Sequence, residues 1–191
     1  MKKLAVLASG SGSNFEAVVN KSTDAYEVVL LITDRDDAYA LQRAENLGVP
    51  SKSILPKNFE NKSAYEQEVL DLIHSYDVDW VALAGYMRIV GPTLLKPYEG
   101  RIINVHPSLL PKFPGKDAIA QALEVEVGKT GVTVHYIDEG IDTGPIISQE
   151  AVEVTKQDTY ETLQQKIRQV EHELLPKTLT KVIREDELIG K

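Results

Sequence analysis

The sequence predicts an α/β fold: a doubly wound, mostly parallel twisted sheet with antiparallel strands near the C-terminal part. Short apolar runs alternate with longer amphipathic stretches over the first 105 residues. These runs are uninterrupted, as in parallel strands buried on both faces. Two later segments alternate apolar and polar residues instead, which is typical of antiparallel strands near a sheet edge. Together these patterns predict right-handed crossovers followed by an antiparallel extension.

The expected elements follow one another in the order that such a sheet requires. Strands are expected at Lys3–Ala8, Val28–Thr33, Trp80–Ala84 and Ile102–Val105, and helices at Asn14–Asn20, Ala38–Leu47, Ser63–Tyr76 and about Thr93–Pro97. The remaining elements are a short helix near Asp117–Leu123, antiparallel strands at Gly131–Ile137 and Pro145–Val154, and a closing helix at Thr159–Arg184 with a break or kink near Pro176. No repeat or linker divides the chain, so residues 1–191 are expected to form a single domain.

Composition and charge exclude several classes of protein. The 191 residues suit one domain, and a net charge of −8 argues against a nucleic-acid surface, which depends on clustered Lys and Arg. The absence of cysteine excludes disulfides, thiolate catalysis and cysteine-ligated zinc, and it is compatible with a cytoplasmic protein. No apolar run approaches the roughly 20 residues needed to span a bilayer, so no membrane partner is expected.

A glycine loop, Gly10–Asn14, lies between the first expected strand and helix. Glycines allow close approach to a phosphate, and the helix N-terminus offers free N–H groups, so a cradle for one phosphate is the favoured interpretation. A plain turn and a dinucleotide site are the alternatives. Asp34 mimics the ribose-binding acid of a dinucleotide site, but Phe15 occupies the third glycine position of that fingerprint.

A second polar cluster follows the expected strand at Ile102–Val105. Asn104 and His106 are two residues apart and share a face, where an amide and an imidazole suit oxyanion stabilisation and proton transfer. Asp142, in a turn rich in Gly and Pro, could face His106 and keep it protonated. From the residues alone, a structural histidine and a turn-capping aspartate remain the stronger alternatives. His135 is expected to pack in the core or behind this cluster rather than to act in catalysis, and His74 is expected to lie on the surface. The residue types leave a metal centre of His106, His135 and Asp142 as an alternative, but no usual metal-ligand spacing appears.

Four motifs together resemble the glycinamide ribonucleotide formyltransferases, the folate-dependent enzymes of purine synthesis. They are residues 8–14 (ASGSGSN), 83–89 (LAGYMRI), 104–111 (NVHPSLLP) and 140–146 (GIDTGPI). The resemblance implies a Rossmann-like formyltransferase fold and a phosphoribosylglycinamide formyltransferase activity. In that reaction, 10-formyltetrahydrofolate is the co-substrate and the amine of 5-phosphoribosyl-glycinamide is the acceptor, in de novo purine biosynthesis. It implies small-molecule partners, no nucleic acid, no metal, and a monomer or weak homodimer.

The resemblance also implies roles for individual residues. The expected catalytic residues are Asn104, His106 and Asp142. The expected ribonucleotide contacts are Gly12, Ser13, Asn14 and Glu171, and the expected folate contacts are Lys62, Met87, Arg88, Ile89, Val90 and Asn104. Family members can carry Arg at the position of Lys62. The N-terminal half is expected to bind the phosphate and the ribonucleotide, and the C-terminal half is expected to bind the folate and carry out catalysis. No role is assigned to the Gly115-Lys116-Asp117 stretch.

Four other functions remain as alternatives. A methionyl-tRNA formyltransferase is expected to carry an additional basic C-terminal domain, and a formyltetrahydrofolate hydrolase an N-terminal regulatory domain. A binding module without catalysis would have little use for Asn104, His106 and Asp142 together. A dehydrogenase would require the dinucleotide fingerprint that Phe15 interrupts.

Overall fold

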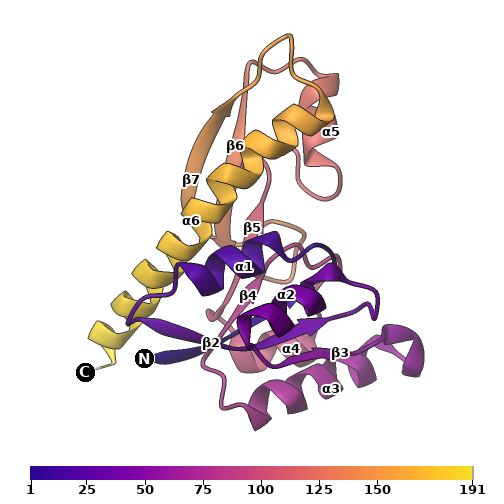
Figure 1. The fold of residues 1–191 in the computed structure, drawn as a ribbon, viewed down its shortest axis with the longest axis vertical. Coiled ribbons are helices and arrows are strands. Elements are labelled where there is room, and N and C mark those ends of the chain that lie inside the picture. The colour runs from indigo at the N-terminus through magenta and orange to yellow at the C-terminus, as the bar shows by residue number, and fades with distance from the viewer. Residues whose placement is uncertain (191) are drawn as a thin grey trace.

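Seven strands form one mixed sheet within residues 1–190, the part of the chain that the computed structural model describes (Figure 1). The strands are β1 (Lys2–Ala8), β2 (Tyr26–Thr33), β3 (Ser51–Ser53), β4 (Trp80–Leu83), β5 (Ile102–His106), β6 (Lys129–Tyr136) and β7 (Ile146–Glu153). Their order is β3-β2-β1-β4-β5-β6-β7. Pairing is parallel from β3 to β5 and antiparallel from β5 to β7, which confirms the predicted fold class.

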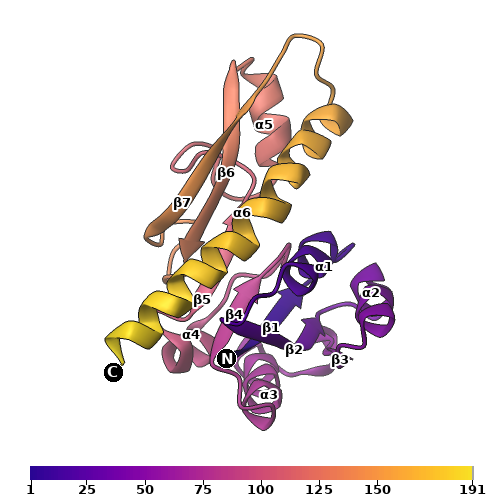
Figure 2. The same ribbon diagram turned by 60° about the vertical axis from the view of Figure 1, so that its left-hand side comes forward.

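Helices cover both faces of this sheet. They are α1 (Ser13–Asn20), α2 (Tyr39–Leu47), α3 (Lys62–Ser75), α4 (Pro92–Leu95), α5 (Ala118–Glu124) and α6 (Tyr160–Ile189), with 3-10 turns at Pro56–Asn58 and Lys96–Tyr98. One apolar core lies between the sheet and α1, α2, α5 and α6, and a second lies between the sheet and α3 and α4. Figure 2 shows α6 running along the sheet from the β6–β7 end toward the N-terminal strands.

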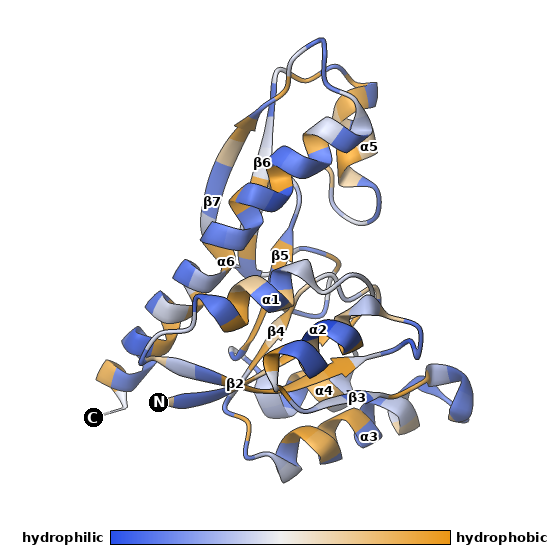
Figure 3. Ribbon diagram, in the orientation of Figure 1, coloured by the Kyte–Doolittle hydropathy of each residue, from blue (hydrophilic) through white to orange (hydrophobic). Residues whose placement is uncertain are grey.

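The central strand β1 explains why its sequence is an uninterrupted apolar run. Leu4, Val6 and Ala8 belong to the first core, and Ala5 and Leu7 to the second, and all five side chains are fully buried. Successive side chains of a strand point to opposite faces, so a strand covered on both sides needs apolar residues at every position. The hydropathy colouring agrees: the central strands are apolar, whereas the outward turns of α2 and α6 are hydrophilic (Figure 3).

Several predicted boundaries were wrong. Strand β3 was missed because its three residues, Ser51–Ser53, are polar. The strand lies at the edge of the sheet, where its side chains are largely exposed and need not be apolar. The helix expected at Thr93–Pro97 is a four-residue α-helix that continues into the Lys96–Tyr98 turn. The break expected near Pro176 is absent, because α6 continues through this buried proline to Ile189. Apolar burial on both sides of Pro176 offsets the lost backbone hydrogen bond.

The position of α6 brings the C-terminal part of the chain to α1. The helix begins with a reciprocal cap between Thr159 and Thr162, then packs against β6, β7, α5 and α1. A salt bridge between Lys21 and Glu173 joins the end of α1 to α6. Residues near 171 therefore face the glycine loop, about 160 residues earlier in the sequence. Within residues 1–190, no helix combines the length and the apolar character that a membrane span requires.

Candidate active site

Gly12 takes the capping position in front of α1 with a φ of +75°, a left-handed conformation that favours glycine. A Cβ placed on this residue would lie 2.7 Å from the Cα and Cβ of Ala40 in α2. Glycine is therefore required here by backbone conformation and by the close approach of α2. The turn leads directly into α1, whose first N–H groups can hold an anion.

Asn14 and Glu171, two predicted contacts of the same ligand, lie side by side. The Asn14 Nδ2 donates a hydrogen bond to Glu171 Oε2 at 2.9 Å, and Glu171 is 8% exposed. Burial raises the pKa of the Glu171 carboxyl, although the Asn14 hydrogen bond and the Arg168 charge oppose this effect. The Asn14 Oδ1 is buried and lacks a hydrogen-bond partner among residues 1–190. A buried acceptor of this kind is suited to a hydroxyl or amine of a ligand.

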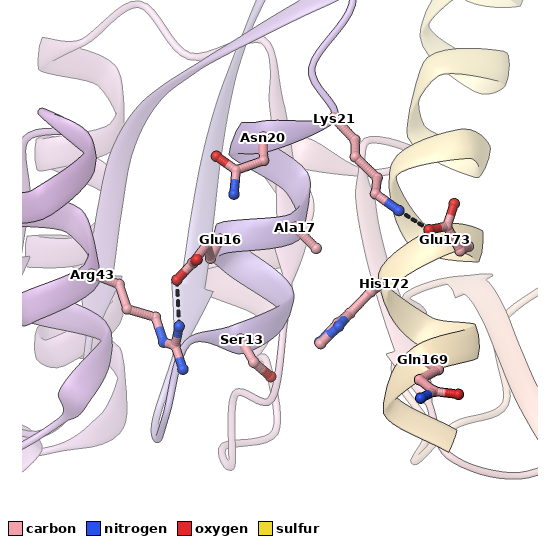
Figure 4. Close-up of a pocket in the computed structure, with 9 residues that line it drawn as sticks. All are labelled: Ser13, Glu16, Ala17, Asn20, Lys21, Arg43, Gln169, His172 and Glu173. Atoms are coloured by element: carbon pink, nitrogen blue, oxygen red, sulfur yellow. Dashed lines mark hydrogen bonds and ion pairs between the residues drawn. The ribbon is translucent and has the colours of Figure 1, made fainter. Parts of the chain in front are cut away.

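A pocket of about 550 Å³ adjoins this pair, between α1, α2 and α6 (Figure 4). Its lining residues are Ser13, Glu16, Ala17, Asn20, Lys21, Arg43, Gln169, His172 and Glu173. Salt bridges join Arg43 to Glu16 and Lys21 to Glu173, while Ser13 and His172 point toward one another across the gap. Burial and the charges of Lys21, Arg168 and Arg43 lower the pKa of His172. This histidine is consequently neutral at pH 7.

The Met87–Val90 segment follows β4 at the carboxyl edge of the parallel strands, where α/β sheets bind ligands. Met87 and Ile89 are 67% and 53% exposed, whereas Val90 is buried. The Arg88 Nε donates to Asp34 Oδ2 at 2.8 Å, so Asp34 holds an arginine in place rather than marking a ribose site. The segment offers two exposed apolar side chains on either side of a half-exposed guanidinium.

Two sequence predictions next to this segment are clarified by the structure. Lys62 is the exposed first residue of α3, and its Cε lies 3.2 Å from a Cβ placed on Gly91, which directly follows the segment. The structure thus brings Lys62 to the Met87–Val90 segment. Phe15 is fully buried in the core between the sheet and the helices. It occupies the space where the dinucleotide fingerprint requires a glycine for close packing, which counts against a dinucleotide site.

Asp142 joins the polar cluster on β5. Its Oδ2 lies 3.4 Å from His106 Nδ1, and its Oδ1 lies 3.5 Å from Asn104 Nδ2 and 3.6 Å from His135 Nε2. The Gly115 N–H donates a hydrogen bond to Asp142 Oδ2 at 2.8 Å. Burial alone would raise the pKa of Asp142, but contacts with His135, the Gly115 N–H and the His106 charge together lower it. The carboxylate therefore remains ionised well below neutral pH.

Both nitrogens of His106 face acceptors. Its Nε2 lies 2.7 Å from the carbonyl oxygen of Phe113, so this nitrogen carries a proton and donates it. The other nitrogen, Nδ1, faces the Asp142 carboxylate at 3.4 Å. The ring is buried, so the carboxylate is only weakly screened by water. Both ring nitrogens of His106 are thus held against oxygen atoms, one of the backbone and one of Asp142.

His135 lies directly opposite Asn104 in the antiparallel pairing of β5 and β6. Its ring is fully buried, and its Nδ1 donates to the carbonyl oxygen of Tyr136 at 2.8 Å. The Nε2 lies 3.3 Å from Asn104 Nδ2 and 3.6 Å from Asp142 Oδ1. The Asn104 amide nitrogen therefore lies between His135 Nε2 and Asp142 Oδ1, the latter at 3.5 Å. The expected position of His135 is confirmed, because its buried ring packs behind the cluster and contacts Asn104 and Asp142.

A metal centre made from His106, His135 and Asp142 was one alternative from the residue types. Among residues 1–190, no group of His, Asp and Glu side chains has an arrangement that could hold a metal ion. These three side chains are instead accounted for by hydrogen bonds and charge contacts with one another and with the backbone. His74 is exposed at the surface, as predicted, and its ring stacks on Tyr98 with centroids 6.0 Å apart.

Comparison with known proteins decides the family. Residues 2–179 match the family model described as formyl transferase. The chain is 49% identical over 187 residues to the phosphoribosylglycinamide formyltransferase of Bacillus subtilis (strain 168), covering 96% of this chain and 95% of the relative. The chain belongs to the formyl transferase family.

Solved structures of formyl transferases agree with this assignment. The phosphoribosylglycinamide formyltransferase from Bacillus halodurans superposes with a TM-score of 0.92 at 52% identity, over 95% of each chain. Glycinamide ribonucleotide transformylase 1 from Geobacillus kaustophilus gives a TM-score of 0.92 at 50% identity, over 96% of this chain and 99% of that one. The resemblance predicted from the four sequence motifs is thereby confirmed.

Several residues of this formyl transferase site were missed from the sequence. The Gly115 N–H contacts the Asp142 carboxylate, although the stretch around it received no role. Thr133, next to His135 on β6, accepts a hydrogen bond from the Leu110 N–H and donates one to the Ser108 carbonyl. These bonds hold the loop that follows His106. No spacing signal marks such residues, because their contacts depend on the pairing of β5 with β6.

Proposed function

We propose that this protein transfers the formyl group of 10-formyltetrahydrofolate to the amine of 5-phosphoribosyl-glycinamide, in de novo purine biosynthesis. The observation that carries the proposal is the convergence of Asn104, His106 and Asp142: the Asn104 and His106 side chains both lie within 3.5 Å of the Asp142 carboxylate. The identity to phosphoribosylglycinamide formyltransferases over nearly the whole chain supports the choice of acceptor.

The acceptor's phosphate binds at the glycine loop in this proposal. The N–H groups at the start of α1, together with Ser13, are suited to a phosphate, and the helix dipole favours its negative charge. The buried Asn14–Glu171 pair lies beside this loop and provides acceptors for ribose hydroxyls. The adjoining pocket of about 550 Å³ leaves room for a nucleotide-sized ligand. Both halves of the chain thus contribute to the ribonucleotide side.

The Met87–Val90 segment and Lys62 bind the folate. Exposed Met87 and Ile89 suit the faces of a flat heterocycle, and the cations of Arg88 and Lys62 suit the carboxylates of the folate's glutamate. The residues present therefore fit the co-substrate. When bound, the folate supplies the formyl carbon that the acceptor's amine attacks.

Asn104 and His106 stabilise the negative charge that develops on the formyl oxygen. The Asn104 amide and the His106 Nδ1 both lie within 3.5 Å of the Asp142 carboxylate, so an amide and an imidazole are held side by side, and preorganised groups of this kind are the main source of oxyanion stabilisation. The His106 Nε2–H is held by the Phe113 carbonyl, which fixes the ring orientation. His135 fixes the Asn104 amide in the same way.

Asp142 directs the proton that the amine loses. Its ionised carboxylate keeps His106 protonated and orients a water molecule, which relays the proton from the attacking amine to the folate nitrogen. The new bond joins the amine nitrogen to the formyl carbon, and the bond from that carbon to the folate nitrogen breaks. Atoms and charges balance without a covalent enzyme intermediate. No metal takes part in this proposal.

The proposed partners are therefore two small molecules, with no nucleic acid and no membrane, and the chain acts as a monomer or weak homodimer in the cytoplasm.

An acceptor panel tests the proposed function. Purified protein is incubated with 10-formyltetrahydrofolate and, in separate reactions, with phosphoribosylglycinamide, methionyl-tRNA or no acceptor. Tetrahydrofolate is expected only with phosphoribosylglycinamide. Turnover with methionyl-tRNA would favour a tRNA formyltransferase, turnover without acceptor a hydrolase, and no turnover in any reaction would refute formyl transfer.

A further inference from the structure

The Met87–Val90 segment has no regular secondary structure, yet buried acceptors from three other elements hold it. The Ser9 hydroxyl, at the end of β1, accepts the Met87 N–H at 2.8 Å. Asp34, after β2, accepts from the Arg88 side chain at 2.8 Å. Glu66, in α3, accepts the Gly91 N–H at 2.7 Å through Oε2. Hydrogen bonds thus hold the segment at both ends, while Met87 and Ile89 are exposed and Val90 is buried.

Glu66 is a carboxylate on the buried, otherwise mostly apolar face of α3. The other buried residues of this helix are Tyr65, Val69, Leu70 and Ile73, and Glu66 itself is only 4% exposed. Burying a carboxylate costs free energy unless hydrogen bonds compensate it. A leucine would fill the same position without that cost. The Gly91 N–H would be buried without a partner if Glu66 were apolar, and this explains why an acidic residue lies on the buried face of the helix.

The Glu66 carboxylate also occupies the space beside Gly91. A Cβ placed on Gly91 would lie 2.6 Å from Glu66 Oε1, so no side chain fits between the segment and α3. Lys62, one turn earlier on α3, contacts the same point through its Cε. The end of the segment therefore packs directly against α3, with Glu66 and Lys62 both beside Gly91.

We propose that Glu66 is a positioning residue for the folate: by holding the Gly91 N–H, it fixes the Met87–Val90 segment in the conformation that binds the co-substrate. This inference rests on the proposed function, since it assigns the segment to folate. Glu66 is expected to touch neither substrate, and it acts only through the backbone of the segment. Its loss therefore affects folate binding and leaves the ribonucleotide side intact.

The test compares Glu66→Leu with Glu66→Gln. Leucine keeps the volume but offers no acceptor, whereas the glutamine amide oxygen still accepts the Gly91 N–H. We expect Glu66→Leu to raise the KM for 10-formyltetrahydrofolate about tenfold or more, with an unchanged KM for the ribonucleotide. Glu66→Gln is expected to stay within about threefold of wild type for both substrates. If the negative charge of Glu66 were what mattered, glutamine would not restore folate binding. Rescue by glutamine therefore indicates that the hydrogen bond to the Gly91 N–H is what positions the segment.

Ile73→Ala is the matched control, because it removes buried volume from the same helix two turns away. It lowers stability and is expected to leave the folate KM normal. Should Glu66→Leu fail to fold, Glu66→Ala replaces it, and hydrogen exchange at the Gly91 N–H is measured beside the kinetics. A normal folate KM in the Leu or Ala variant, or an equal rise in Ile73→Ala, overturns the inference. A wild-type protein without formyl transfer refutes the proposed function, and with it this inference.

Discussion

Asp142→Asn is expected to reduce kcat severely while both substrates still bind. Asparagine has nearly the size of aspartate and tolerates the left-handed conformation of this residue, whose φ is +54°. Its amide oxygen can still accept the Gly115 N–H. The substitution therefore removes the negative charge beside His106 and leaves the shape of the loop unchanged.

The size of the effect follows from the distance between the two charges. At 3.4 Å and an effective dielectric constant of about 20, the attraction between the Asp142 carboxylate and the His106 imidazolium is about 5 kcal/mol. Both side chains are largely buried, so solvent screening reduces this value little. Since each 1.36 kcal/mol is about tenfold in rate, the upper limit of the loss in kcat is about 10³–10⁴-fold.

The assay is steady-state formyl transfer, followed as tetrahydrofolate formation, with each substrate varied in turn. We expect a kcat reduced by about 10²–10⁴-fold and both KM values within about threefold of wild type, because the lost interactions act chiefly in the transition state. Part of the activity is expected to return at lower pH, where acid restores the imidazolium, until protonation of the substrate amine limits it. An Asp142→Asn enzyme with normal kcat, or with its whole defect in KM, would refute the reasoning.

Three further variants test other parts of the account. Glu171→Gln is expected to raise the ribonucleotide KM. It is also expected to raise the melting temperature above that of wild type at pH 7, and to do so less at pH 4. Burial raises the pKa of Glu171, so the stability that this group contributes is present below its unfolded pKa of about 4.3 and is lost as pH rises through the folded pKa. Ile89→Pro, which deletes an N–H of the segment, is expected to weaken folate binding in a titration far more than Met87→Ala. Gly12→Ala is expected to lower the melting temperature, because its Cβ would meet Ala40 and its φ is left-handed.

The fold was largely predictable because burial on both faces leaves a direct signature. A strand such as β1, covered by helices on either side, must be apolar at consecutive positions, and the sequence shows this run plainly. The short edge strand Ser51–Ser53 lacks that requirement and was missed. Pro176 was expected to interrupt α6, but local propensity is outweighed there by tertiary packing.

The candidate site was predictable only in part, because its geometry depends on long-range contacts. Strand periodicity alone placed Asn104 and His106 on one face, and the structure brings both to Asp142. The approach of Asp142 depends on the conformation of the loop between β6 and β7, and the contact of His135 depends on the register of β6 against β5. Residue types and spacing contain neither fact. The resemblance to known formyltransferases supplied the role of Asp142 where spacing favoured a turn cap.

The most direct test of the central claim is a double-mutant cycle on formyl transfer. The rate of the chemical step is measured for wild type, His106→Ala, Asp142→Asn and the double variant, with 10-formyltetrahydrofolate and phosphoribosylglycinamide both saturating. Because the two side chains are proposed to act as one unit, the double variant is expected to lose about as much rate as the more damaging single variant. Losses that multiply, so that the free-energy costs of the two substitutions add, would contradict the account.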